Sequence, residues 1–187
     1  MENERYALLI VDMVKDFTDP DGLVYYPQNR EVLPVIRKVL DFCRERGDLI
    51  IFAQHCYRRD KPDRNLTCMR KNCIEGSGGE LIDPMLPVDE KLDYVVKKRR
   101  YSAFFGTDLD LILREHGIRK TVIVGTKTNC CVRATVTDAY YLDYDVTVLS
   151  DCVATNSEEV NRVHLTDIQK YFGKVCTSAE FMADRGE

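Results

Sequence analysis

Residues 121–139, TVIVGTKTNCCVRATVTDA, contain the structural unit on which the fold rests. The run TVIVG at 121–125 is apolar and rich in β-branched residues, which is typical of a strand buried on both faces. A short polar turn with two adjacent cysteines follows, and the sequence from that turn to about Leu142 predicts a helix. A buried strand that leads directly into a helix is the building unit of a parallel α/β sheet.

The same unit recurs on both sides of this stretch. Gly47 and Gly117 are predicted to end two of the helices, and Thr177 with Glu180 forms a capping-box pattern that opens the last one. Strands are predicted at 6–12, 49–54, 92–97, 121–125, 145–150 and 173–176, and further helices at 31–46, 107–116 and 157–170. The alternation predicts one α/β domain over residues 1–187: a doubly wound, six-stranded parallel sheet with helices on both faces.

Composition narrows the class of protein. The 187 residues are 44% hydrophobic and 31% charged, with a net charge of −4, which is an ordinary globular balance. The densest basic run, KKRR at 97–100, is short, so no nucleic-acid partner is expected. No apolar run approaches the ~20 residues of a membrane span, and the charged start MENER does not resemble a signal peptide. The eight cysteines are therefore interpreted as reduced thiols of a cytoplasmic protein.

Several reactive side chains follow the ends of predicted strands. Asp12 ends the first strand, His55 the second, and Lys97 or Lys98 the third, while Cys130 and Cys131 follow the fourth. Because the carboxyl ends of parallel strands meet at one sheet edge, an acid, an ammonium and a thiol are expected to converge there.

Together these groups suit nucleophilic catalysis. A helix N-terminus and a nearby ammonium favour the thiolate, a carboxylate can move the proton, and turn amides can hold an oxyanion. Each residue also has an ordinary structural role: an Asp can cap a turn, a Lys can be solvated, and a Cys can simply pack. Helical spacing by itself does not choose between Cys130 and Cys131.

Three separated blocks carry a resemblance over roughly residues 6–155. IVDMVKDF, KKRRYSAFFGTDLDLILREHGI and VGTKTNCCVRATVTDA are similar, in order and spacing, to the isochorismatase-like cysteine hydrolases. The resemblance implies that Cys131 is the nucleophile, Asp12 the acid and Lys98, not Lys97, the lysine of the site. It also implies a cis peptide bond between Thr126 and Lys127, with an oxyanion hole formed by the backbone N–H groups of Lys127 and Cys131.

The sequence departs from the nicotinamidase branch of that superfamily. Nicotinamidases carry an Asp two residues before the His that ends the second strand, and this pair helps to bind a metal; here that position is Ala53. No metal or other cofactor is therefore expected. An alternative is a zinc site, for which the candidate ligands are His55, Cys56, Cys68 and Cys73, although their spacings are irregular.

Substrate contacts are predicted from the same resemblance and from the long segment 55–90, which has no clear period and is therefore expected to be functional. Tyr25 and Tyr26 are expected near the mouth of the site. The predicted contacts are Phe17, His55, Arg58, Tyr101 and Phe104. Arginines of this segment could grip a carboxylate, which favours an N-carbamoyl or ureido acid as substrate.

The function predicted is that of a cysteine amidohydrolase. It would cleave a C–N bond of a small amide, N-carbamoyl or ureido compound through a thioester and release ammonia or an amine. Three alternatives stay open: an isochorismatase that cleaves a vinyl ether, a catalytically silent binding member, and a redox protein that uses Cys130 and Cys131. The resemblance also implies a homo-oligomer, either a dimer or a tetramer.

Overall fold

The computed structural model describes residues 5–186, in which strands and helices alternate. The elements in chain order are β1 (Tyr6–Val11), α1 (Lys15–Thr18), α2 (Pro27–Glu45), β2 (Leu49–His55), α3 (Arg64–Cys68), β3 (Tyr94–Lys98), α4 (Leu109–Glu115), β4 (Lys120–Thr126), the π-helix η1 (Thr128–Val132), α5 (Arg133–Tyr141), β5 (Asp145–Ala154), α6 (Glu158–Tyr171), β6 (Lys174–Cys176) and α7 (Ser178–Gly186).

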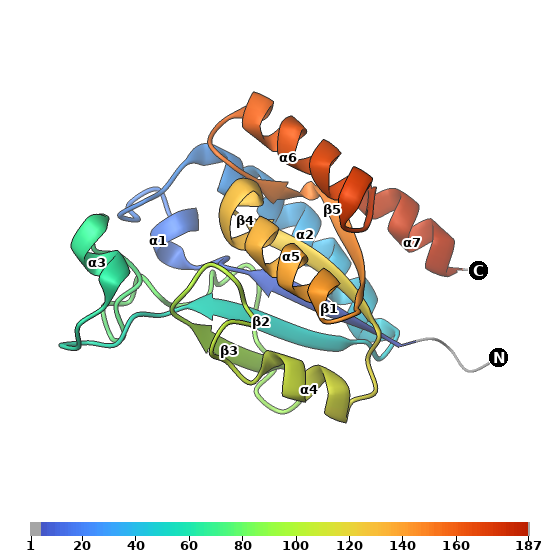
Figure 1. Ribbon diagram of the computed structural model, residues 1–187, viewed down its shortest axis with the longest axis horizontal. Coiled ribbons are helices and arrows are strands. Elements are labelled where there is room, and N and C mark those ends of the chain that lie inside the picture. Colours follow the sequence, from blue (N-terminus) through green and yellow to red (C-terminus); the bar gives the residue numbers. More distant parts are fainter. Residues whose placement is uncertain (1–4, 187) are drawn as a thin grey trace.

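The strands form one sheet in the order β3-β2-β1-β4-β5-β6, and every neighbouring pair is parallel. The predicted fold class, a doubly wound six-stranded parallel sheet, is thereby confirmed. In Figure 1 the carboxyl ends of the strands point toward the side that carries α1 and α3, while both termini lie at the opposite side. The chain order of the strands reverses direction at β1, so the fold places a site just beyond the carboxyl ends of β1 and β4.

Side chains of β1 alternate between two cores, which is why the whole strand is apolar. Leu8 and Ile10 pack on the face covered by α2 and α7, whereas Leu9 and Val11 pack on the face covered by α4, α5 and α6. Burial on both faces removes the polar positions that a half-exposed strand would show. The continuous apolar run in the sequence therefore reflects a central position in the sheet.

The structure differs from the predicted elements mainly where chain geometry is irregular. Helix α2 starts at Pro27, whose fixed φ suits a first helical position, and so precedes the apolar period that begins near residue 31. The predicted helix after the cysteine turn begins as the π-helix η1 before it becomes α5. Segment 55–90 contains the short helix α3, and its N-cap Asp63 accepts a hydrogen bond from the Asn65 amide.

No helix within residues 5–186 is both long and apolar enough to cross a membrane. All eight cysteines are free thiols in the structure.

Thr177 and Glu180 form the predicted capping box. The Thr177 backbone amide donates to Glu180 Oε2 over 2.8 Å, and the Glu180 backbone amide donates to Thr177 Oγ1 over 3.2 Å.

Candidate active site

The predicted acid and lysine form a buried ion pair at the carboxyl edge of the sheet. Asp12 directly follows β1 and Lys98 ends β3, and Lys98 Nζ donates to Asp12 Oδ2 over 2.7 Å. Both side chains are 0% exposed. Lys97, the other candidate, is half-exposed and pairs with Glu75 at 2.9 Å, so the pleat of β3 turns it away from the site.

His55 joins this pair from the end of β2. Its Nδ1 lies 3.2 Å from Lys98 Nζ and 3.6 Å from Asp12 Oδ2. Since an ammonium has only donors, the neutral form of His55 accepts from Lys98 at Nδ1, and its ring proton is then on Nε2. That nitrogen is buried and has no hydrogen-bond partner among residues 5–186. It is available to a ligand.

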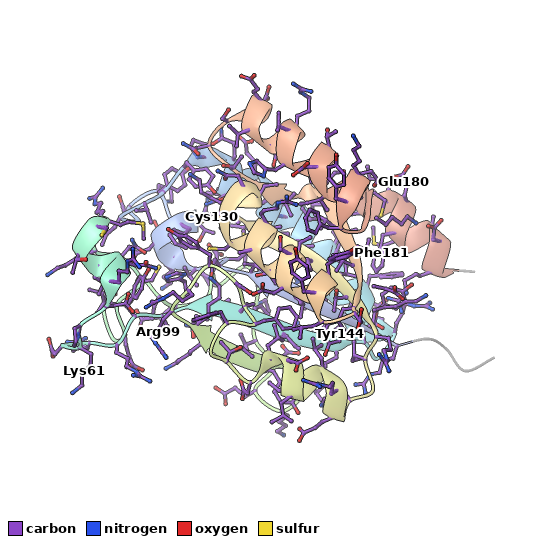
Figure 2. The ribbon with its side chains drawn as sticks, in the orientation of Figure 1. Lys61, Arg99, Cys130, Tyr144, Glu180 and Phe181 are labelled. Atoms are coloured by element: carbon purple, nitrogen blue, oxygen red, sulfur yellow. The ribbon has the colours of Figure 1, made fainter. Side chains whose placement is uncertain are left out.

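Of the two cysteines, Cys131 is the one that reaches the ion pair. Its sulfur, one Asp12 oxygen and one His55 nitrogen all lie within 4.8 Å of one another. Cys131 is 7% exposed and belongs to η1, at the start of the helical segment after β4. Cys130 is more exposed, and it too lies on the cavity side, where Figure 2 labels it near the start of that segment.

The charges of the site follow from burial and proximity. Burial opposes ionisation of Asp12, but the Lys98 ammonium outweighs it and holds the pKa of the carboxyl below its ordinary value. Burial likewise opposes the ammonium of Lys98, whereas Asp12 raises its pKa above 10.5. The pair is therefore a carboxylate and an ammonium at neutral pH.

Cys131 is a thiol in the resting site. The hydrogen bond with the Cys130 thiol, burial and the Asp12 carboxylate all raise the pKa of Cys131 well above 9.0, against the opposing effect of Lys98. The same thiol–thiol hydrogen bond is the main reason that the pKa of Cys130 lies below 9.0. A carboxylate beside a protonated thiol is the arrangement that a base-activated nucleophile needs. Asp12 Oδ1 has no hydrogen-bond partner in the described part of the chain and can accept that proton.

The turn between β4 and η1 has unusual backbone geometry. The peptide bond between Thr126 and Lys127 is cis, at the position that the resemblance implies. The amides of Cys130 and Val132 both donate to the Lys127 carbonyl, over 3.0 and 3.1 Å. Asp12 itself has a φ of 54°, a conformation that non-glycine residues rarely adopt and that often marks functional positions.

The residues present do not fit a metal centre of the nicotinamidase kind. Asp12, His55 and Cys131 each offer a ligand atom, but the Lys98 ammonium already occupies Asp12 Oδ2 and His55 Nδ1. A cation placed there would face that ammonium directly. The alternative zinc set is also not assembled, because Cys56, Cys68 and Cys73 do not gather with His55 in the described part of the chain.

A cavity of about 620 Å³ opens onto His55 and Cys131. It is lined by two further predicted contacts, Phe17 and Tyr101, and by Tyr25 and Tyr26, which were expected near its mouth, together with Lys127. Most of the remaining lining is apolar or amide-bearing: Leu23, Val24, Tyr57, Met69, Arg70, Asn72, Thr126, Asn129, Cys130 and Asn156. The space suits a small molecule with a few polar groups.

Two predicted substrate contacts, Phe104 and Arg58, do not line this cavity. Phe104 is 9% exposed, belongs to the core under α4 and α5, and stacks on Tyr144 with ring centroids 5.8 Å apart. Arg58 is exposed and does not line the cavity. It follows a strand end, but the chain there turns into the 55–90 loop and carries its side chain outward.

Sequence reasoning missed the residues that reach the cavity from loops. Tyr57, Met69 and Asn72 come from segment 55–90, and Asn129 and Asn156 come from the turns after β4 and β5. The only available signal was position, since each turn follows a strand at the same sheet edge. Loop residues have no period that would have indicated which of them face inward.

Comparison with known proteins agrees with this geometry. A family model described as the isochorismatase domain matches residues 6–180. A probable inactive nicotinamidase of Arabidopsis thaliana is 32% identical over 186 residues, covering 94% of this chain and 93% of that protein. The ureidoacrylate amidohydrolase RutB of Enterobacter sp. (strain 638) is 37% identical over 207 residues, covering 95% of this chain and 88% of that one.

A solved structure of an isochorismatase-like hydrolase from Alkaliphilus metalliredigens superimposes with a TM-score of 0.90 at 34% identity, covering 96% of this chain and 98% of that chain. Three findings lead to the same family: the family model matches nearly the whole chain, the relatives are of similar length, and the fold is shared. This chain belongs to the isochorismatase family of hydrolases.

Proposed function

We propose that the chain is a cysteine amidohydrolase of small amides, N-carbamoyl or ureido compounds. One observation carries the proposal: a buried carboxylate–ammonium pair lies against the Cys131 thiol at the wall of a cavity. The similarity to a ureidoacrylate amidohydrolase supports the substrate class. The thiol nucleophile disfavours the vinyl-ether alternative, since a carboxylate that activates a thiol suits acyl transfer.

In the first half of the reaction, Asp12 acts as a base. Its carboxylate takes the proton of the Cys131 thiol, and the thiolate sulfur forms a bond to the carbonyl carbon of the substrate. Lys98 stabilises the negative charge while the proton moves. The backbone N–H groups of Lys127 and Cys131 would donate to the oxyanion. Asp12 then protonates the nitrogen as the C–N bond breaks, and ammonia or an amine leaves.

In the second half, water replaces the nitrogen. The thioester carbon is attacked by a water molecule whose proton passes to Asp12. The carbon–sulfur bond breaks, the acid product leaves, and Cys131 regains its proton from Asp12. One base therefore serves both half-reactions, and no net proton or electron is required from outside. His55 Nε2, a donor at the cavity wall, would hold a polar group of the substrate.

The test is ammonia release from a panel of nicotinamide, N-carbamoyl amino acids, ureidoacrylate and biuret. We expect Cys131→Ala to abolish turnover and Cys130→Ala to keep it, because only Cys131 reaches Asp12. A stable acyl adduct on Cys131, detected by mass spectrometry, would support the thioester. Turnover that survives in Cys131→Ala would overturn the mechanism. Binding without turnover in the wild type would favour the alternative of a catalytically silent binding protein. One relative is described as a probable inactive nicotinamidase.

A further inference from the structure

Lys127 stands out among the charged residues near the site. Its side chain is half-buried and lines the cavity, and its ammonium lies 5.4 Å from the centre of the Tyr26 ring. No carboxylate pairs with it among residues 5–186. A half-buried lysine at a cavity wall usually has an acidic partner or extends into solvent. This one has an aromatic face instead.

The Tyr26 ring is held in place beneath that ammonium. Its hydroxyl is hydrogen-bonded to Thr126 Oγ1, and it also lies 3.5 Å from the Ala154 carbonyl. Both partners belong to strand ends of the sheet, at β4 and β5. A cation over a fixed aromatic face is held without being neutralised, so the charge stays available to a ligand. The turn thus presents a positioned positive charge close to Cys131.

The charge of the cavity differs in sign from that of the whole chain. The lining contains two cationic residues, Lys127 and Arg70, and no Asp or Glu among the described residues. The chain as a whole has a net charge of −4. The positive lining is therefore a local feature, and such a cavity attracts anions. His55 Nε2, buried and unpartnered, adds a neutral donor to the same wall.

We propose that the substrate carries a carboxylate close to its scissile amide and that the Lys127 ammonium binds it. This inference rests on the proposed amidohydrolase function and makes it more specific. The backbone N–H of Lys127 would hold the oxyanion while its side chain selects the acid. The preferred substrates would then be short acids such as half-amides of dicarboxylic acids or N-carbamoyl amino acids, and uncharged amides would be poor substrates.

The experiment uses substrate pairs that differ in charge and hardly in shape. Oxamate, malonamate and succinamate are each compared with the methyl ketone of the same heavy-atom count: pyruvamide, acetoacetamide and levulinamide. For each pair we would measure the ratio of kcat/KM for the acid to that for the ketone. We expect the ratio in the wild type to exceed about ten for at least one chain length, and to fall as salt is added.

Variants assign that preference to one side chain. Lys127→Met keeps the length and the backbone N–H but removes the charge, and we expect it to lower the ratio at least tenfold, mainly through KM of the acid. Lys127→Arg should retain most of the preference, and Lys127→Glu should reverse it. Arg58→Met is the matched control, because it removes the same charge from a site outside the cavity. It should leave the ratio unchanged.

Different failures have different meanings. A wild type that hydrolyses both members of each pair equally well, or prefers the ketones, would overturn the inference and leave the amidohydrolase intact. A preference for acids that persists in Lys127→Met would also overturn it. If no member is hydrolysed, the kinetic comparison is replaced by binding, and oxamate and pyruvamide are titrated against the Cys131→Ser protein by calorimetry. Equal affinity for the two, or no binding of oxamate, would then reject the acid site independently.

Discussion

At the scale of single residues, the central feature is a charge pair with no exposed surface. Removing Lys98 and Asp12 from water costs free energy that is recovered only because they contact each other at 2.7 Å. Asp12 also adopts a φ of 54°, a further local cost. A protein keeps such an arrangement when the surrounding sheet holds it in place, and here Asp12 is fixed by the hydrogen bond from its amide to the Ala53 carbonyl over 2.9 Å.

The pH dependence of activity follows from the same pair. Because the pKa of Asp12 is lowered below 3.8, the base form is present above that pH and the acid limb of kcat/KM lies below it. Because the pKa of Lys98 is raised above 10.5, its ammonium persists up to that pH. The stability contributed by the pair is likewise lost only as pH falls through the lowered Asp12 pKa or rises through the raised Lys98 pKa. We expect a plateau from about pH 5 to 9.

Replacement of Lys98 by Met should move the acid limb of this profile upward. Without the ammonium, burial dominates and raises the pKa of Asp12, so the base becomes protonated at higher pH. We also expect a loss of about 100-fold in kcat at the plateau, and of up to about 3–5 kcal/mol in the free energy of unfolding. Lys97→Met is the control, because Lys97 is exposed and paired with Glu75. An unshifted acid limb in Lys98→Met would contradict the assignment of Asp12 as the base.

At the scale of elements, the important junction is the carboxyl end of the paired strands β1 and β4, beside the cysteine turn. Gly125 has a φ of +114°, and a Cβ built on it would lie 2.0 Å from the carbonyl oxygen of Val11. Only glycine fits there, because β1 and β4 approach each other just before the chain turns toward Lys127. This close approach is what brings Asp12, at the end of β1, near the helical segment that carries Cys131.

Gly125→Ala should therefore damage both stability and the site. We expect the free energy of unfolding, measured with denaturant, to fall by about 3 kcal/mol or more, since the new methyl group meets main chain that cannot move aside. Gly47→Ala provides the comparison. Gly47 also has a positive φ, +72°, but open space around it, so it should cost only about 1 kcal/mol. Equal effects of the two substitutions would show that backbone conformation, and not the approach of β1, explains the glycine.

At the scale of the whole molecule, helix α7 ties the end of the chain to its beginning. Arg185 donates to both oxygens of Asp48, which precedes β2, and its guanidinium lies 4.0 Å from the centre of the Tyr6 ring on β1. Its side chain is 9% exposed and that of Asp48 is 1% exposed. Phe181 of α7 packs into the same core as α2. The helix therefore covers one face of the sheet and links three elements.

Arg185→Ala should accordingly destabilise the protein by about 3 kcal/mol, because the buried Asp48 carboxylate loses the Arg185 guanidinium and keeps the Tyr6 amide. The exposed pair between Lys174 and Asp184, at 2.8 Å, involves the same helix, and Lys174→Ala should change the stability by less than about 1 kcal/mol. Urea unfolding of both variants, followed by circular dichroism, measures the difference. Similar losses in the two variants would mean that burial of the Arg185 pair adds nothing.

The expected dimer or tetramer is a separate prediction, which light scattering would test.

Local patterns in the sequence determined the elements, and the family resemblance predicted the reactive residues. Buried strands and amphipathic helices are visible in a sequence because their periods depend only on neighbouring residues. The motifs around Asp12, Lys98 and Cys131 could be aligned with the family for a related reason, since each is a short block attached to one strand. The structure brings these three residues together at the edge where parallel strands end.

The tertiary structure decided what surrounds that chemistry. Arg58 and Phe104 lie close in sequence to site residues, yet one faces outward and the other fills a core. Segment 55–90 reaches the cavity because distant contacts fold it back, such as the 2.6 Å hydrogen bond from the Cys73 amide to the Asp16 carboxylate. The position of the Lys127 ammonium likewise depends on Tyr26, a hundred residues away along the chain from Thr126. Long-range contacts of this kind have no period in the sequence, so only the folded chain determines them.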